Sequence, residues 1–215
     1  MNKKILKNSF KSRNHYLEAL KILNKIKKPV KILEVGAADC KIKEFLNKNI
    51  KYTSIDLKQG SDYNTDLNKE KLPFKDNTFD AIMCLETLEH TLYPHKAMQE
   101  LKRVTKPKGL MILSMPNEYN YWLRINYVLG IKKMQTDTPF LVVEKLQHIH
   151  KPRAKDVINF FKQHTEIKKI VYIWQSKASG TKNIFTYIDK PINLLAKIYP
   201  SLFSRVVMVF AKNKK

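Results

Sequence analysis

Hydrophobic and polar positions follow two periods along the chain, one typical of buried strands and one typical of amphipathic helices. Compact apolar runs predict strands over residues 30–35, 52–56, 79–84, 110–115, 167–174 and 206–211. Apolar residues at helical spacing predict helices over residues 9–28 and 39–48, from Pro94 to the break at Lys106–Gly109, and over 152–163. The helix from Pro94 should bury its apolar stripe, Ala97, Met98, Leu101 and Val104.

This alternation predicts an α/β protein with one doubly wound sheet, mostly parallel, with helices on both faces and an antiparallel last strand. We expect a single domain over residues 1–215. Its parts are expected to be a helical extension (1–28), a cofactor-binding half (30–115), an acceptor cap (116–151) and a C-terminal half of the sheet (152–215). Ligands in such sheets bind at the carboxyl ends of the strands.

Charge changes this picture little. The chain has 41 Lys and Arg against 19 Asp and Glu, a formal net charge of +22. That charge is compatible with a nucleic-acid or anionic-membrane partner. Only five of the basic residues are Arg, the side chain that recognises phosphates and bases in bidentate fashion. A lysine-rich solvated surface is therefore the preferred interpretation, and nucleic acid is not favoured.

The compartment is expected to be the cytoplasm. The two cysteines form no C-x-x-C pair and no zinc pattern, which indicates reduced thiols. The first ten residues lack the apolar core of a signal peptide, and no apolar run is long enough to span a bilayer. Residues 191–210 could lie on a membrane surface, although burial against the sheet is the preferred interpretation.

The turn after the first strand carries the first candidate site. Residues 34–40 read Glu-Val-Gly-Ala-Ala-Asp-Cys and open the next helix, where free N–H groups suit a carboxylate. Gly36 would let the backbone approach a ligand, although a glycine here is also ordinary turn chemistry. Asp56 ends the second strand, about 20 residues further on, where a carboxylate can bind ribose hydroxyls. Together they indicate a nucleoside-containing cofactor.

Four further segments carry a family resemblance: residues 66–80, 84–90, 101–110 and 114–117. In order and spacing, residues 30–117 resemble class I S-adenosylmethionine-dependent methyltransferases of the type 11-like group, which have a Rossmann-like sheet. The resemblance implies S-adenosyl-L-methionine as the cofactor. One departure is clear, since Ala38 and Cys40 stand where the family motif has its second and third glycines.

The resemblance also implies roles for individual residues. Glu34 and Gly36 would support the methionine end, and Asp56 would hold the ribose. Asp66 and Leu67 would flank the adenine, while Leu85 would line the sulfonium region. The full set expected to contact the cofactor is Glu34, Gly36, Ala38, Asp56, Leu57, Asp66, Leu67 and Leu85.

The turn after the third strand offers candidate chemistry. Glu86, Glu89 and His90 are spaced to share a helical face, where they could move a proton or hold a divalent ion. The pattern is similar to the E-x-x-E-H of quinone O-methyltransferases, some of which use a metal. A purely structural role in the turn is the preferred interpretation. Glu89, His90 and His148 are the catalytic candidates, but none is assigned, because positioning supplies most of the rate of methyl transfer.

Residues 116–151 are long for a connection and rich in aromatic residues, which predicts a cap over the acceptor. The candidate acceptor-binding residues are Asn117, Trp122, Arg124 and His150. The C-terminal half of the chain resembles methionine-biosynthesis W-type and polysaccharide-associated methyltransferases. The same residues could instead form the core of the cap.

The sequence therefore predicts a methyltransferase (EC 2.1.1.-) acting on a small-molecule or glycan acceptor by in-line transfer. Two alternatives stay open. One is a nucleic-acid (RNA) methyltransferase, which the charge suggests. The other is a non-catalytic regulatory protein that keeps the fold, which Ala38 and Cys40 suggest.

Overall fold

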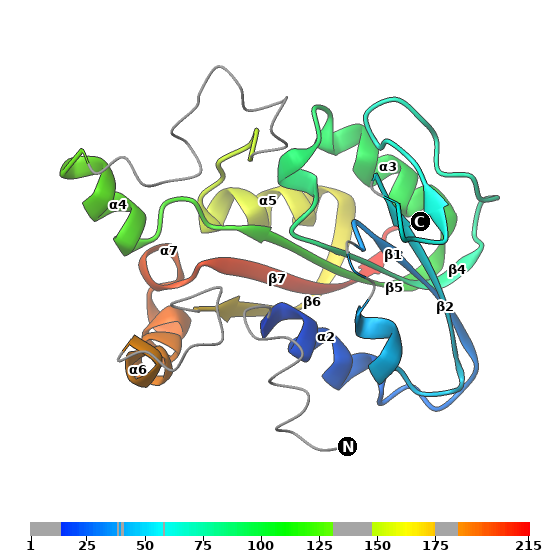
Figure 1. Cartoon of the computed structure of the whole chain (residues 1–215), viewed down its shortest axis with the longest axis horizontal. Coiled ribbons are helices and arrows are strands. Elements are labelled where there is room, and N and C mark those ends of the chain that lie inside the picture. The colour runs from blue at the N-terminus through cyan, green and yellow to red at the C-terminus, as the bar shows by residue number, and fades with distance from the viewer. Residues whose placement is uncertain (1–13, 38, 40, 58, 131–147, 175–184) are drawn as a thin grey trace.

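The computed structural model of the protein describes residues 14–37, 39, 41–57, 59–130, 148–174 and 185–215 (Figure 1). These residues form a seven-stranded sheet in the order β3-β2-β1-β4-β5-β7-β6. The strands are β1 (Val30–Val35), β2 (Ile50–Asp56), β3 (Tyr63–Asn64), β4 (Phe79–Leu85), β5 (Thr105–Pro116), β6 (Thr165–Ile173) and β7 (Val206–Asn213).

The sheet is parallel except for its last strand, as predicted. β1 pairs in parallel with β2 and β4, and β4 pairs in parallel with β5. β7 is antiparallel to both β5 and β6, so it lies between them and not at the edge of the sheet. The chain runs outward from β1 through β2 to β3 and then returns to β4. The topological switch point therefore lies between β1 and β4, where ligands bind in open α/β sheets.

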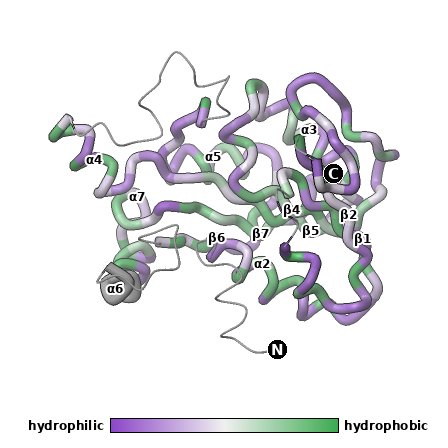
Figure 2. The backbone as a smooth tube through the Cα atoms, in the orientation of Figure 1, coloured by the Kyte–Doolittle hydropathy of each residue, from purple (hydrophilic) through white to green (hydrophobic). Residues whose placement is uncertain are grey.

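Helices cover both faces of the sheet. The helical elements are α2 (Asn14–Leu23), η1 (Lys41–Phe45), η2 (Leu88–His90), α3 (Pro94–Val104), α4 (Tyr121–Val128), α5 (Ala154–His164), α6 (Phe185–Ile198) and α7 (Pro200–Phe203). α3 and α5 bury their apolar stripes against one face, and α2 and η1 lie against the other (Figure 1). Figure 2 shows apolar residues concentrated along the central strands β4, β5 and β7. Two hydrophobic cores thus hold the sheet, which confirms the doubly wound arrangement.

Most predicted elements are present, and the predicted stripe of α3 is buried at all four positions. The predicted helix over 39–48 is wrong in length and type, because it is a five-residue 3-10 helix, Lys41–Phe45. The helix predicted over 9–28 is described over Asn14–Leu23, and residues 1–13 lie outside the described residues. The short strand β3 and the helices α4, α6 and α7 were not predicted from the sequence.

The Lys106–Gly109 segment does not separate helix from strand as predicted. α3 ends at Val104 and β5 begins at once, so this segment lies inside the strand. Phe79 of β4 pairs with Thr105, whereas Ala81 pairs with Leu110, so the turn-forming residues form a bulge. Within it Lys108 has a φ of 57°.

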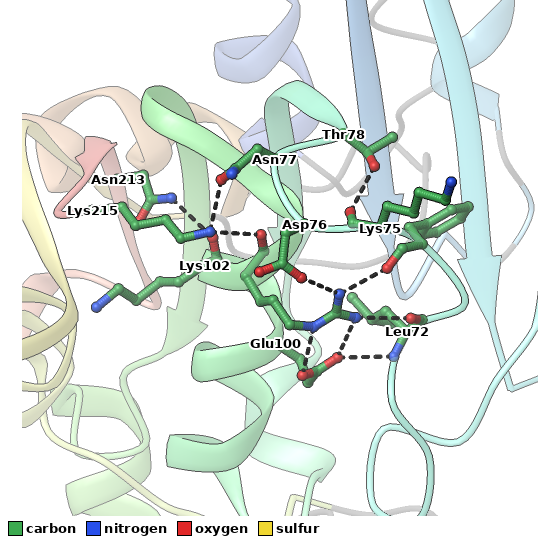
Figure 3. Close-up of polar contacts among 11 residues, drawn as sticks. Leu72, Lys75, Asp76, Asn77, Thr78, Glu100, Lys102, Asn213 and Lys215 are labelled. Atoms are coloured by element: carbon green, nitrogen blue, oxygen red, sulfur yellow. Dashed lines mark hydrogen bonds and ion pairs between the residues drawn. The ribbon is translucent and has the colours of Figure 1, made fainter.

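A clamp of hydrogen bonds joins α3 to the loop before β4 (Figure 3). The Arg103 guanidinium donates to Glu100 and Asp76 at 2.8–2.9 Å, and to the carbonyl oxygens of Leu72 and Phe74 at 2.8–2.9 Å. Hydrogen bonding to Arg103 lowers the pKa of the Glu100 carboxyl below its usual value. The planar guanidinium matches several acceptors at once, so this single residue fixes the loop that leads into β4.

No helix within the described ranges is both long and apolar enough to cross a bilayer. Residues 191–210 belong to three elements, α6, α7 and β7. The side chains of Ile192 and Ala196 are buried, while Leu194 and Ile198 are exposed. This supports the preferred interpretation that the segment packs on the sheet.

Candidate functional site

The carboxyl ends of four strands meet at one edge of the sheet. β1 ends before Gly36, β2 ends at Asp56, β4 ends before Glu86 and β5 ends before Asn117. Parallel pairing brings the first three turns together, since Val35 lies opposite both Ile55 and Cys84. The structure therefore places the predicted cofactor turn and the predicted ribose carboxylate on neighbouring strands at the switch point.

The turn at Gly36 requires a glycine for two reasons. Its φ is +75°, a left-handed conformation that side chains disfavour. A Cβ at this position would lie 2.1 Å from Oγ1 of Thr87. Thr87, which was not among the predicted site residues, thus lies directly against Gly36, and the approach of a cofactor to Gly36 stays a prediction. The N–H groups of Gly36 and Ala37 both donate to the carbonyl oxygen of Ile55, at 2.9 and 3.1 Å.

The turn does not open the α-helix that was predicted over residues 39–48, and binding of an anion at this turn stays a prediction. The element after this turn is the short 3-10 helix η1, and it has too few aligned peptide groups to build a helix dipole. Ala38 and Cys40, which depart from the family motif, lie outside the described residues.

Glu34 is a buried carboxylate on β1, and its partner comes from the next strand. The Tyr52 hydroxyl on β2 donates a hydrogen bond to it. The ammonium of Lys43 lies 5.9 Å from the Tyr52 ring centre. Tyr52 is a second residue that the sequence reading missed. Its only sequence signal is its position on the strand beside Glu34.

The remaining predicted cofactor residues differ in exposure. Asp56 is half-buried, and Leu57 beside it is 49% exposed. The Asp66 carboxylate accepts the N–H of Asn68 at 2.9 Å and so shapes its own turn. The side chains of Leu67 and Leu85 pack against opposite cores of the sheet. Among the members of this set that the structure describes, only Leu57 is exposed.

Glu86, Glu89 and His90 do not share one face as the helical spacing predicted. Glu86 precedes η2 with a φ of 51°, and its carboxylate accepts a hydrogen bond from the Ser114 hydroxyl at 3.0 Å. Glu89 and His90 lie toward His148, and the Glu86 carboxyl interacts electrostatically with both Glu89 and His148. Burial raises the pKa of both the Glu86 and Glu89 carboxyl groups above their usual range.

Glu89, His90 and His148 form a compact cluster. One ligand atom of each lies within 4.8 Å of the others. The rings of His90 and His148 meet edge to face with centres 4.7 Å apart. The Glu118 carboxylate is hydrogen-bonded to Nδ1 of His148. The structure thus joins all three catalytic candidates and adds Glu118, which the sequence reading did not select.

The four predicted acceptor-binding residues lie in different surroundings. The buried Asn117 side chain donates to the carbonyl oxygens of Ser201 and Ser204, and it accepts the N–H groups of Tyr119 and Ala154. These four contacts use the hydrogen-bonding capacity of the amide in joining the end of β5 to α5 and α7.

The other three are closer to the surface. Arg124 donates to the carbonyl oxygen of Tyr119 at 2.6 Å and to the Ser201 hydroxyl at 3.1 Å. Trp122 on α4 is 54% exposed. His150 contacts the carbonyl oxygen of Thr91 through Nε2 at 2.9 Å. Their part in acceptor binding stays a prediction.

A groove of about 570 Å³ lies between the beginnings of α3 and α5. Met115 at the end of β5 and His150 contribute to its lining. Its other lining residues are Leu92, Tyr93, Pro94, His95, Lys96, Pro152, Asp156, Val157 and Phe160. Because His150 is two residues from His148, the groove adjoins the Glu89 cluster. Its volume and mostly apolar lining are typical of small-molecule sites.

Comparison with known proteins points to one family. Residues 33–113 match the sequence model of a family described as methyltransferase domain. An uncharacterised protein of Methanocaldococcus jannaschii is 30% identical over 118 residues, which cover 42% of this chain and 52% of that protein. An uncharacterised methyltransferase of Schizosaccharomyces pombe is 43% identical over 67 residues, 31% of this chain and 22% of that protein. The matches thus span about half or less of these relatives.

Solved structures share the fold over nearly the whole chain. A SAM-dependent methyltransferase from Archaeoglobus fulgidus has a TM-score of 0.58 at 15% identity, with 97% of this chain and 98% of that chain covered. The N-methyltransferase NodS from Bradyrhizobium japonicum, solved with S-adenosyl-L-homocysteine, has a TM-score of 0.57 at 14% identity, covering 94% and 87%. The [4+2]-cyclase SpnF has a TM-score of 0.60 at 14% identity, covering 94% and 80%. The fold is therefore shared by proteins of more than one activity.

Proposed function

We propose that this chain, which carries a methyltransferase domain of the class I fold, transfers the methyl group of S-adenosylmethionine to a small-molecule or glycan acceptor. The observation that carries the proposal is the match to the methyltransferase family over residues 33–113. The turns that this stretch places at the carboxyl edge support it. The cofactor supplies a methyl group already activated on a sulfonium, so the protein has mainly to bind and orient the two reactants.

The surroundings of Gly36 and Asp56 fit that cofactor. The Gly36 N–H is bonded to Ile55, the residue before Asp56, so the two turns lie against each other. In our proposal Asp56 accepts hydrogen bonds from the ribose hydroxyls, and Leu57 packs its exposed side chain on the nucleoside. Glu34, which accepts a hydrogen bond from the Tyr52 hydroxyl, stabilises the turn that begins at Gly36.

Calorimetric titration with S-adenosyl-L-homocysteine tests this assignment. Asp56→Asn keeps the side-chain shape and removes the charge, so affinity should fall about 10–100-fold, the range expected for a charged hydrogen bond. Glu166→Gln is the matched control. It removes one negative charge at an exposed position of β6, where Glu166 pairs with Lys168, and should leave affinity unchanged. Equal affinity in both variants would contradict the role of Asp56.

The lining of the groove between α3 and α5 favours the proposal that the methyl acceptor is a small molecule. Its walls are largely apolar, and its ionisable groups are Tyr93, His95, Lys96, His150 and Asp156. Such a groove favours a compact molecule with an apolar part and a few polar groups over a long polyanion. A screen that measures release of S-adenosyl-L-homocysteine across small molecules, glycans and RNA would identify the class of acceptor.

RNA is the second candidate acceptor, because the net charge is +22. Binding driven by phosphate contacts falls steeply with salt. Tight, salt-dependent binding of RNA, with turnover on RNA alone, would favour this alternative. Cofactor binding without turnover on any acceptor would instead favour a regulatory protein that keeps the fold.

A further inference from the structure

A buried carboxylate and two imidazoles converge beside the carboxyl edge of the sheet. We propose that Glu89, His90 and His148 bind a divalent transition-metal ion such as Zn²⁺. One ligand atom from each residue lies within 4.8 Å of the other two. Glu89 and His90 are adjacent on η2, whereas His148 comes from the segment that precedes α5. Two imidazoles and one carboxylate form a ligand set that proteins use for zinc and related ions.

The Glu89 side chain is the strongest sign that a cation belongs here. The residue is 0% exposed, and among the described residues neither carboxylate oxygen has a hydrogen-bond partner. Nε2 of His148 is 3.9 Å from Oε1 of Glu89, beyond hydrogen-bonding distance. Buried charges in proteins are normally paired or coordinate a metal. A divalent ion between Glu89 and the two imidazoles would supply the missing partner.

Glu118 holds His148 in the orientation that a metal ligand needs. Its carboxylate is hydrogen-bonded to Nδ1 of His148, while Nε2 faces Glu89. Histidines that bind metals usually donate their second ring N–H to a carboxylate or a carbonyl group, which fixes the tautomer and the ring. Glu118 is itself buried, so this contact is shielded from water.

Backbone contacts hold the two ligand-bearing segments together. The N–H groups of Ile149 and His150 donate to the carbonyl oxygen of Glu89 at 2.9 and 3.1 Å. Nε2 of His150 contacts the carbonyl oxygen of Thr91 at 2.9 Å. His148 is therefore held against η2 by contacts of the next two residues, Ile149 and His150, and the cluster does not depend on a single side-chain contact.

The geometry favours a transition metal over magnesium. Ligands about 2.0–2.2 Å from a tetrahedral zinc ion lie about 3.4 Å apart, so the three side chains, now within 4.8 Å of one another, would close by up to about 1.4 Å on binding. Imidazole nitrogens suit zinc, cobalt and nickel, whereas magnesium prefers oxygen ligands. Three protein ligands leave one position open for water or a substrate atom.

The cluster lies near the acceptor groove, because His150, which lines the groove, donates its N–H to the carbonyl oxygen of Glu89 at 3.1 Å. A metal there would hold an acceptor hydroxyl, thiol or amine group near the carboxyl edge. This role rests on the proposed function, but metal binding itself does not. The two are therefore tested separately.

Calorimetric titration of chelator-treated full-length protein with Zn²⁺ and with Co²⁺ tests the site. We expect one equivalent of each to bind, and the visible spectrum of the Co²⁺ form should show the bands of a low-coordinate site with nitrogen ligands. Mg²⁺ should not compete. Glu89→Gln and His148→Asn should weaken binding at least 100-fold, and Glu118→Gln about 10–100-fold, the range for a residue that orients a ligand.

Two readouts separate loss of the metal from loss of the fold. Zn²⁺ at 100 times its Kd should raise the melting temperature of the wild type by about 5–10 °C and leave that of Glu89→Gln unchanged. Without metal, Glu89→Gln should melt no earlier than the wild type, because the amide keeps the side-chain shape and places no charge in this buried position. His164→Gln, a histidine outside the cluster, is the control and should bind Zn²⁺ like the wild type.

The inference is overturned if the wild type binds no stoichiometric Zn²⁺, or if Glu89→Gln and His148→Asn bind it as tightly as the control. Titration of the same samples with S-adenosyl-L-homocysteine distinguishes the two proposals. Normal binding of that ligand together with failed metal binding would remove the metal site alone.

Discussion

Gly36→Ala should destabilise the fold, because the new side chain would clash with Thr87, a residue in the turn that follows β4. The φ of +75° costs an alanine about 1–2 kcal/mol. The new Cβ would also lie 2.1 Å from Oγ1 and 2.6 Å from Cγ2 of Thr87. Thr87 cannot turn aside freely, because its hydroxyl donates to the carbonyl oxygens of Leu85 at 3.0 Å and Val35 at 3.3 Å. Relief of the clash adds about 1–3 kcal/mol.

The expected loss for Gly36→Ala is therefore about 2–5 kcal/mol in the free energy of unfolding. For a chain of this length it corresponds to a fall in melting temperature of about 5–15 °C. Urea unfolding gives the free energy, and calorimetry gives the melting temperature.

Two variants separate backbone strain from the clash. Gly130 has a comparable φ of +62°, and no atom of the described residues lies within 4 Å of its Cβ position. Gly130→Ala should therefore lose only about 1–2 kcal/mol. Thr87→Gly removes all three atoms in the clash, so in the double variant it should recover about 1–3 kcal/mol of the Gly36→Ala loss. The reasoning is refuted if Gly36→Ala loses no more than Gly130→Ala, or if Thr87→Gly recovers nothing.

Three further predictions concern the clamp and the cap. Because Arg103 lowers the pKa of Glu100, that carboxylate stabilises the fold above its ordinary pKa of 4.5, and the contribution is lost as the pH falls through the lower folded-state value. Glu100→Gln should therefore flatten the acid decline of the urea midpoint between about pH 5 and pH 3; an unchanged decline would contradict the assignment. Asn117→Ala should lower the free energy of unfolding by about 2–4 kcal/mol while the folded fraction still binds S-adenosyl-L-homocysteine normally. Unchanged melting with lost turnover would instead place Asn117 against the acceptor. Trp122→Ala should change the melting temperature by less than about 2 °C, because the side chain is 54% exposed, and should lower kcat/KM for the acceptor at unchanged cofactor affinity. Early melting would make Trp122 part of the structural core of the cap.

The sequence by itself determined most strands of the sheet and the order in which the candidate cofactor residues follow those strands. Periodicity located β1, β4 and α3 closely, including the buried stripe of α3, because the period of side chains is a local property of strand and helix geometry. Parallel alternation then placed Gly36 and Asp56 at one edge, since successive strands of this kind end on the same side. The family resemblance over residues 30–117 agrees with the family match over 33–113.

Predictions from local sequence were wrong where strand pairing, rather than turn-forming residues, determined the backbone conformation. The Lys106–Gly109 stretch has the composition of a helix-ending turn, yet it continues as part of β5, because β4 supplies a partner strand that accepts a bulge. The helical spacing of Glu86 to His90 predicted one face. Glu86, with a φ of 51°, instead bonds to Ser114 on the neighbouring strand.

Only the tertiary structure decided which distant side chains meet. His148 lies far along the chain from Glu89, and no period relates them. They meet because the segment before α5 is hydrogen-bonded to η2. Thr87 covers Gly36 because β1 and β4 are neighbours across the switch point. Sequence periodicity records which side of an element is apolar, whereas contacts between turns depend on strand order and register, which are fixed only when the whole sheet assembles.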